Sequence, residues 1–372
     1  MSSDSSLPGL YVHVPFCRSK CRYCGFYSRT DLRGVPRWLE ALETEARLYE
    51  DFPGPFDSLY VGGGTPSVLS PDRLGRLISS LAERFDFRED SEITLEANPD
   101  DLSLELLREC RSLGFNRISI GIQSLNDDEL RFLGRRHDGE QGKRALSWAR
   151  RAGFRRIGVD LIYGLPGQPF SRWLRTLRAI SAFQPDHVSC YQLTVEEGTV
   201  FHKMEREGGI RLGGEEEQRD FFLGTSRFLE KAGFIHYEVS NFAAEELCRS
   251  RHNVKYWSHV SYLGLGPSAH SFHQDRRWWN ASSLDGYCRW VEEGRKPVDG
   301  EEVLSEEQKR LEALYLGFRT REGVPLKALE NDADWREAVR NLQRSGLILV
   351  QGERVVSTRK GWAVADGLPL CF

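Results

Sequence analysis

The sequence predicts an α/β protein in which six parallel strands form an incomplete barrel or a strongly curved open sheet, followed by a small α+β module. Two features predict this fold. Short runs of β-branched residues alternate with longer amphipathic stretches over the first 232 residues, and such alternation is typical of a parallel sheet with right-handed crossovers. From about Pro297 the pattern changes to two amphipathic stretches and a hairpin. We therefore expect a core over residues 1–296, of which 235–296 are an extension, and a module over residues 297–372.

The core elements follow one another as strand–helix units. Each predicted strand is a short run that contains Val or Ile. The strands span residues 10–14, 58–61, 92–96, 117–122, 157–162 and 187–192. Each predicted helix has apolar residues at helical spacing. The helices span residues 37–49, 71–85, 104–113, 139–152, 171–183 and 215–232. In either arrangement of six such units, ligands bind at the carboxyl ends of the strands.

The C-terminal module is predicted to have a winged-helix-like α+β fold. Residues 304–318 and 335–344 have the spacing of amphipathic helices, and residues 347–357 form a hairpin that turns near Gly352. Winged helices often bind DNA, but this segment has no dense basic stripe. We therefore expect no nucleic-acid partner.

The composition excludes some classes of protein. The 372 residues include 40% hydrophobic and 28% charged side chains, enough for a large core, and carry a net charge of −4. This charge gives no general attraction to nucleic acid or to an anionic membrane. The N-terminus lacks the basic start and apolar core of an export signal, and no apolar run reaches membrane-spanning length. A cytoplasmic protein without an integral membrane segment is expected.

Three cysteines directly follow the first predicted strand. Cys17, Cys21 and Cys24 have C-x3-C-x2-C spacing, which favours an iron–sulfur cluster with one iron open to an outside ligand. Zinc usually takes four protein ligands, and no second Cys or His pair lies nearby. A disulfide framework also fits poorly, because the other cysteines are scattered along the chain. They are Cys110, Cys190, Cys248, Cys288 and Cys371.

Residues suited to ligand binding occur at the ends of the other predicted strands. Gly62, Gly63 and Gly64 allow a close backbone approach to a ligand and offer N–H groups. Glu96 and Asp160 are carboxylates suited to an ammonium group or to ribose hydroxyls. The amide of Gln123 and the guanidinium of Arg135 supply directional donors. Each residue alone could belong to an ordinary turn or a solvated loop, but their convergence on one rim predicts a single site.

The motifs resemble those of the radical S-adenosylmethionine superfamily. They include Tyr23 before Cys24, the Gly62-Gly-Gly-Thr-Pro66 turn, Glu96-Ala-Asn-Pro99, Ser119-Ile-Gly-Ile-Gln-Ser124, Leu133-Gly-Arg-Arg-His137 and Asp160-Leu-Ile-Tyr-Gly-Leu-Pro-Gly167. Within the superfamily, the chain from about Tyr11 onward is similar to the oxygen-independent coproporphyrinogen III oxidase group. The resemblance implies an incomplete (β/α)6 barrel of the radical S-adenosylmethionine type.

The resemblance also implies cofactors and site residues. It implies a [4Fe–4S] cluster on Cys17, Cys21 and Cys24, with S-adenosylmethionine bound to the open iron. Tyr11, Gly63 and Glu96 would line that molecule, with Tyr23 near the adenine, and Gly64 would also be a cofactor-binding residue. Thr65, Gln123, Arg135 and Asp160 match positions that contact a second S-adenosylmethionine in the oxidase, and the sequence leaves open whether this chain binds a second molecule.

Two departures separate the chain from the oxidase branch. Phe26 stands where that branch has a fourth cysteine, and only ten residues precede Tyr11. Both features resemble instead the HemW branch of heme chaperones. The segment from His252 to Trp257 also matches the His-Asn-x-x-Tyr-Trp motif associated with heme in that branch, and a neutral imidazole is a common axial ligand of heme iron. His270 is a weaker second candidate, and a buried aromatic cluster with a structural histidine is the alternative.

The resemblance implies a heme chaperone that binds heme, a [4Fe–4S] cluster and S-adenosylmethionine and passes heme to an acceptor protein, such as a respiratory heme protein. It is compatible with peripheral membrane association. One alternative is an oxygen-independent coproporphyrinogen III dehydrogenase supplied by an external electron donor. Another is a radical enzyme with an unrelated substrate, in which the His252 motif is purely structural.

Overall fold

A single large sheet dominates the computed structural model, which describes residues 6–330 and 334–372. In this part of the chain twelve strands pair in the order β12-β11-β10-β9-β1-β2-β3-β4-β5-β6-β8-β7. The six predicted parallel strands form its centre. They are β1 Gly9–Val14, β2 Phe56–Gly63, β3 Phe87–Ala97, β4 Arg117–Gln123, β5 Arg156–Tyr163 and β6 His187–Gln192. No ladder joins the outer strands β12 and β7 within the described residues, so the sheet is open.

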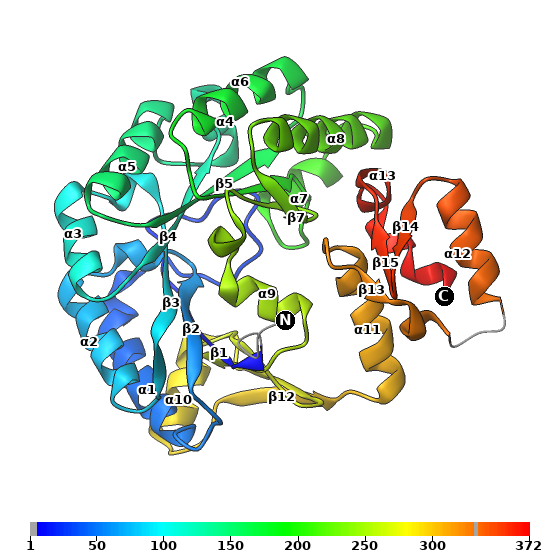
Figure 1. The fold of residues 1–372 in the computed structure, drawn as a ribbon. Helices are drawn as coiled ribbons and strands as arrows, with labels where there is room; N and C mark the ends of the chain where they lie inside the picture. The colour runs from blue at the N-terminus through cyan, green and yellow to red at the C-terminus, as the bar shows by residue number, and fades with distance from the viewer. Residues whose placement is uncertain (1–5, 331–333) are drawn as a thin grey trace.

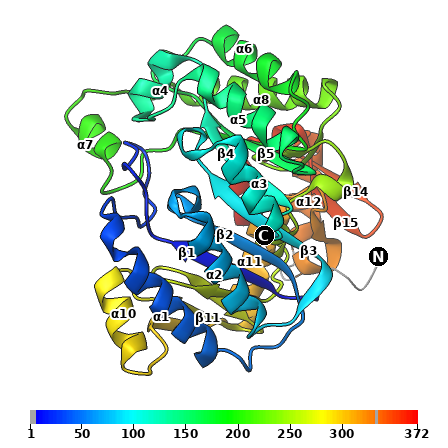
Figure 2. The same ribbon diagram turned by 90° about the vertical axis from the view of Figure 1, so that its left-hand side faces the viewer.

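Six long helices cover the outer face of this sheet (Figures 1 and 2). They are α1 Val35–Leu48, α2 Pro71–Ala82, α3 Leu104–Ser112, α5 Gly139–Arg151, α6 Phe170–Ser181 and α8 Glu215–Lys231. Their local sequences explain where several of them begin. Ser103 caps α3 through its side chain, and Asp138 with Gln141 forms a capping box at α5. The predicted alternation of strands and helices is confirmed.

Short elements missed by the sequence analysis extend the sheet at both edges. The added strands are β7 Ile235–Glu238, β8 Asn241–Ala243, β9 Tyr262–Leu265, β10 His270–His273, β11 Arg276–Asn280 and β12 Val298–Val303. The added helices are α4 Asp127–Leu133, α7 Val200–Arg206, α9 Arg251–Trp257 and α10 Leu284–Glu292. β9 pairs with β1 in parallel, whereas β8 pairs with β6 in the antiparallel sense. Elements of three to nine residues carry too little periodicity to be predicted from the sequence.

The C-terminal module contains the predicted helices and hairpin. They are α11 Glu306–Phe318, α12 Trp335–Arg344, β14 Ile348–Gln351 and β15 Arg354–Ser357, and β13 Val324–Pro325 adds a third strand to the hairpin. A short helix, α13 Arg359–Trp362, follows the hairpin. A small core of its own, which includes Phe318 and Ile348, fills the module.

Several contacts hold this module against the large sheet. Arg319 Nη2 lies 3.1 Å from a carboxylate oxygen of Glu238 in β7. The rings of Trp362 and His236 pack with their centroids 4.3 Å apart. β12 begins at Val298 and pairs with β11 of the large sheet. The predicted boundary between residues 296 and 297 stays a prediction, and residues 1–5 and 331–333 of the two predicted segments lie outside the described residues.

Parallel register brings the ends of the central strands to one edge of the sheet. Val14 pairs with Gly63, Ala97 with Ile120, and Tyr163 with Gln192. The polar residues at these strand ends therefore lie along a common rim.

Candidate functional site

A cavity of about 1600 Å³ opens at this rim. Its walls come from the loop after β1, the ends of β2 to β6, α8, the start of α9, and residues 362–367 of the C-terminal module. Pockets for single drug-sized ligands measure roughly 300–1,000 Å³. The cavity therefore has room for more than one such molecule.

Three thiols lie on one wall of the cavity. Cys17, Cys21 and Cys24 all line it and all are free, and burial raises the pKa of the Cys17 and Cys24 thiols. Among the described residues, no three His, Cys, Asp or Glu side chains are close enough to hold one metal ion. The assignment of the three thiols as ligands of an iron–sulfur cluster therefore stays a prediction.

Three side chains behind the thiols connect Cys17 to Cys21. Thr65 Oγ1 donates a hydrogen bond to Cys17 Sγ at 3.3 Å and accepts one from Asn98 Nδ2 at 3.0 Å. Asn98 Oδ1 accepts a hydrogen bond from Arg135 Nη2. Arg135 Nη1 lies 3.4 Å from Cys21 Sγ. Donors of this kind orient sulfur ligands and tune a cluster, so Thr65 and Arg135 can act on the thiols as well as on a ligand in the cavity.

Glu96 presents a buried carboxylate to the same cavity. Tyr60 Oη donates a hydrogen bond to Oε1 at 2.6 Å, and the N–H of Gly63 donates to Oε2 at 3.1 Å. Burial, together with the nearby carboxylate of Asp160, raises the pKa of Glu96 to about 7. Because both hydrogen-bond donors are neutral, the carboxylate suits a cationic ligand such as an ammonium group.

Asp160 and Gln123 lie on the adjoining strands. Ser119 Oγ donates a hydrogen bond to Asp160 Oδ2 at 2.8 Å, and burial raises the pKa of Asp160. Gln123 lies at an irregularity in the β4–β5 pairing with φ of 64°, and its buried Oε1 has no hydrogen-bond partner among the described residues. An unsatisfied acceptor on a cavity wall and a strained backbone are both typical of a ligand site.

The remaining predicted contacts divide into two groups. Gly63, Gly64 and Tyr23 line the cavity, and Gly63 has φ of 102°, a conformation that favours glycine. Tyr11 does not line the cavity in this structure, and its hydroxyl lies 3.1 Å from Nδ1 of His13. The roles of these residues stay predictions.

His252 lies behind the wall of the cavity rather than on it. Its side chain is 1% exposed, and both ring nitrogens have partners, with Nδ1 at 3.1 Å from Ser58 Oγ and Nε2 at 2.9 Å from Tyr256 Oη. Burial lowers the pKa of the imidazole to about 3, so the ring is neutral. A heme iron could reach Nε2 only if Tyr256 gave up its hydrogen bond. The heme-ligand role of His252 therefore stays a prediction that requires a local rearrangement.

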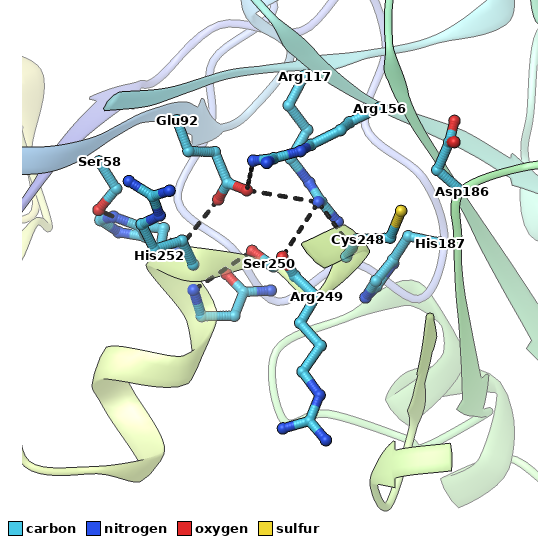
Figure 3. A network of polar contacts seen from close by, with 12 residues as sticks. Ser58, Glu92, Arg117, Arg156, Asp186, His187, Cys248, Arg249, Ser250 and His252 are labelled. Atoms are coloured by element: carbon cyan, nitrogen blue, oxygen red, sulfur yellow. Dashed lines mark hydrogen bonds and ion pairs between the residues drawn. The ribbon is translucent and has the colours of Figure 1, made fainter. Parts of the chain in front are cut away.

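A buried polar network fixes the start of α9 to the sheet (Figure 3). Glu92 Oε1 accepts a hydrogen bond from the backbone N–H of His252 at 3.2 Å, and its Oε2 lies 3.4 Å from Nη1 of both Arg117 and Arg156. Arg117 also donates to the carbonyl oxygen of Cys248 at 3.0 Å. The network sets which face of α9 is turned toward the cavity.

Asn253, rather than its neighbour His252, lines the cavity. The second residue of the His-Asn-x-x-Tyr-Trp segment therefore lies where a ligand in the cavity could contact it. His270, the weaker candidate, is exposed in β10 and does not line the cavity.

The sequence analysis missed several residues of the site. Tyr60, Asn98 and Asn253 all line the cavity. Asn98 and Asn253 lie within motifs that the sequence analysis recognised, so these two residues could have been predicted as part of the site. Tyr60 lies inside an ordinary strand pattern, which does not distinguish it from other strand residues.

Comparisons with known proteins agree with this architecture. Residues 11–180 match the Radical SAM superfamily, and residues 304–364 match the HemN C-terminal domain. The heme chaperone HemW of Mycobacterium tuberculosis strain H37Rv is 35% identical to this chain over 371 residues, which cover 97% of this chain and 93% of the relative. The heme chaperone HemW of Lactococcus lactis subsp. lactis strain IL1403 is 33% identical over 96% and 95% of the two chains. The chain belongs to the HemW family.

The fold of this HemW family member is similar to that of an oxidase whose structure has been solved. Coproporphyrinogen III oxidase (HemN) from Escherichia coli, a radical SAM enzyme, has a TM-score of 0.83 and 26% identity to this chain, over 99% of this chain and 90% of the oxidase. The similarity extends through the C-terminal module.

Membership of the radical SAM superfamily implies a [4Fe–4S] cluster and S-adenosylmethionine. The site fits both groups, because three cysteines, the buried carboxylate of Glu96 with neutral partners, and Gln123, whose buried amide oxygen is unsatisfied, all line one cavity. None of the helices in the described parts of this HemW family member has the length and apolar character needed to cross a membrane.

Proposed function

We propose that this protein is a heme chaperone that binds heme, a [4Fe–4S] cluster and S-adenosylmethionine and transfers the heme to an acceptor protein. One observation carries the proposal. The cavity that three thiols line on one wall is also lined by Asn253 of the His-Asn-x-x-Tyr-Trp segment. The names of the HemW relatives support the heme part of the proposal.

Different residues of the cavity would bind the cluster and S-adenosylmethionine. Cys17, Cys21 and Cys24 would hold the cluster, which when bound supplies an iron that is open to an outside ligand. Glu96 and the N–H of Gly63 would orient the amino acid part of S-adenosylmethionine, with Glu96 as the partner of its ammonium group. Gln123 and Asp160 would contact polar groups of S-adenosylmethionine, whether one or two molecules bind.

Two aromatic side chains of the cavity suit a flat ligand such as a porphyrin. Phe26 is 70% exposed and Tyr191 is 42% exposed, yet both line the cavity. Large exposed aromatic rings at a cavity mouth are typical of binding surfaces. Phe26 replaces the extra cysteine of the oxidase branch and would pack against a porphyrin face, while His252 would become the axial ligand once its wall opens.

The proposal includes an acceptor that is itself a heme protein, with respiratory heme proteins as the first candidates. The transfer would take place in the cytoplasm or at a membrane surface where the acceptor lies. An external electron donor is needed only if the cluster is reduced during the cycle.

Heme transfer can be tested directly. Cluster-reconstituted protein loaded with heme would be mixed anaerobically with the apo form of a b-type cytochrome domain, and separately with excess apomyoglobin as a passive heme trap. A chaperone predicts a transfer rate that rises with the concentration of the cytochrome and exceeds the rate to the trap. Equal rates that do not depend on acceptor concentration would mean simple heme dissociation and would contradict the proposal.

A second candidate is a coproporphyrinogen III dehydrogenase. The TM-score of 0.83 to the Escherichia coli oxidase favours it, because the match covers 99% of this chain and 90% of the oxidase. The absence of a cysteine at position 26 argues against it.

A further inference from the structure

We infer that Tyr60 holds His252 behind the wall of the cavity and that a cationic ligand on Glu96 releases this hold. Tyr60 is then a positioning residue through which S-adenosylmethionine controls access of heme to His252. This inference rests on the proposed function, because heme is the ligand that His252 would bind once it is released.

Tyr60 lies between the cavity and His252. Its side chain lines the cavity, whereas that of His252 does not. The two rings stack with their centroids 5.2 Å apart and their planes inclined by 27°. A ligand that approaches from the cavity therefore meets Tyr60 before it meets the imidazole.

The hydroxyl of Tyr60 is anchored to Glu96. Its hydrogen bond to Oε1 is 2.6 Å long, and Gly62 leaves the space that this contact needs. A Cβ atom at position 62 would lie 2.7 Å from the Tyr60 ring and 2.9 Å from the carboxyl carbon of Glu96. Any larger residue would push the tyrosine and the carboxylate from their present positions.

A cation on Glu96 would change this anchor. An ammonium group brings three charged donors to the carboxylate, and charge-assisted hydrogen bonds are about twice as strong as neutral ones. Because the Glu96 carboxylate is buried and each of its oxygens already has a donor, the ammonium would compete with the phenol hydroxyl for Oε1. Once the hydroxyl is released, only ring packing holds Tyr60 against His252.

Two ligands are then coupled through one side chain. Occupancy of Glu96 favours the open position of Tyr60. Heme ligation by His252 requires the same open position, from which the heme iron replaces the Tyr256 hydroxyl as the partner of Nε2. By linkage, each ligand must strengthen the binding of the other by the same factor.

The test compares two tyrosines that make the same kind of contact. Tyr287 Oη donates a 2.6 Å hydrogen bond to Glu45, a buried carboxylate outside the cavity, so Tyr287→Phe controls for the loss of such a bond. Heme would be titrated by absorbance into the anaerobic, cluster-reconstituted wild type, Tyr60→Phe and Tyr287→Phe, each with and without S-adenosylmethionine. Electron paramagnetic resonance of the heme would report ligation by histidine.

The wild type and Tyr287→Phe are expected to bind heme at least about 5-fold more tightly with S-adenosylmethionine, whereas Tyr60→Phe should bind tightly without it and respond less than about 2-fold. The histidine-ligated signal should depend on S-adenosylmethionine in the wild type but not in Tyr60→Phe. The wild type alone gives a further check, because heme must raise the affinity for S-adenosylmethionine by the same factor.

Two results would overturn the inference alone. They are heme binding by the wild type that S-adenosylmethionine does not change, and a Tyr60→Phe variant that responds to S-adenosylmethionine as the wild type does. A wild type that binds no heme would overturn the proposed function together with the inference.

Discussion

Nη1 of Arg117 lies 3.4 Å from the carboxylate of Glu92, and both side chains are buried, with 3% and 0% of their surface exposed. The same nitrogen donates to the carbonyl oxygen of Cys248, and Glu92 accepts the N–H of His252. One buried ion pair therefore connects β3 and β4 to both the segment before α9 and its second residue. This arrangement makes the position of the His252 motif depend on the core of the sheet.

Replacing Glu92 by Gln should destabilise the protein and loosen α9. Removing one partner of a buried ion pair costs about 3–5 kcal/mol, because the other charge stays buried. Hydrogen exchange should accelerate in residues 250–257 at temperatures below the unfolding midpoint. Glu292→Gln is the matched control, because its ion pair with Arg37 is exposed and surface pairs contribute about 0–1 kcal/mol. Equal effects of the two variants would contradict the role assigned to Glu92.

Replacing Thr65 by Val should weaken retention of the cluster. The change keeps the shape of the side chain but removes the hydroxyl that connects Cys17 to Asn98, and loss of a hydrogen bond that orients a metal ligand typically costs about 10–100-fold in affinity. Iron content and the visible absorbance after a chelator challenge measure this loss. Thr44→Val removes an exposed hydroxyl that bonds only to the Glu40 carbonyl in α1 and should retain the cluster. Normal retention in Thr65→Val would contradict this account of the thiol wall.

Replacing Glu45 by Gln should reduce the dependence of stability on pH. Tyr287, Asn280 and the N–H of Gly266 donate to this carboxylate, yet burial raises its pKa to about 7 from the usual 4.5. Between these values the folded state binds more protons than the unfolded state, so stability falls as the pH rises, by up to about 3 kcal/mol.

Thermal midpoints from pH 4.5 to 8 measure this dependence. The wild type should lose stability up to about pH 7 and then level off, whereas Glu45→Gln should have a smaller slope. Glu40→Gln, at an exposed position of the same helix, should keep the slope of the wild type. An unchanged slope in Glu45→Gln would show that this carboxyl does not titrate in that range.

Replacing His252 by Gln should weaken heme binding and leave the cluster absorbance intact. Glutamine can still bond to Ser58 but is a poor iron ligand. His236→Gln controls for the loss of a buried histidine, because both of its ring nitrogens are bonded, to Ser226 and to the Val239 carbonyl, and it does not line the cavity. A heme titration of both variants decides the point. Unchanged affinity in His252→Gln would leave the histidine with a purely structural role.

The central helices could be predicted from the sequence because each has several turns with apolar residues at helical spacing. The central strands could be predicted because each contains a clear apolar run. It also predicted that residues such as Cys17, Glu96 and Asp160 would meet, because the carboxyl ends of parallel strands share one edge, and the structure brings all three to one cavity. The edge strands β7 to β12 were missed because they are short and obtain their stability from pairing rather than from their own pattern.

Some relationships depend on register and rotation that one sequence does not contain. The Tyr60–Glu96 hydrogen bond exists because Tyr60 pairs with Thr94 across β2 and β3, which directs both side chains to the same face. Likewise, nothing in the His-Asn-x-x-Tyr-Trp segment says which side of a two-turn helix faces the cavity. In the folded chain Glu92 binds the backbone N–H of His252, and in this arrangement Asn253 lines the cavity whereas His252 does not.

The most direct test of the heme chaperone account uses two parallel anaerobic measurements on one preparation. The cluster would be reconstituted, S-adenosylmethionine added, and one half titrated with heme while the other receives coproporphyrinogen III and a reductant. The account predicts stoichiometric heme binding and no formation of protoporphyrinogen. Catalytic formation of protoporphyrinogen would contradict it and would assign the cavity to porphyrinogen oxidation.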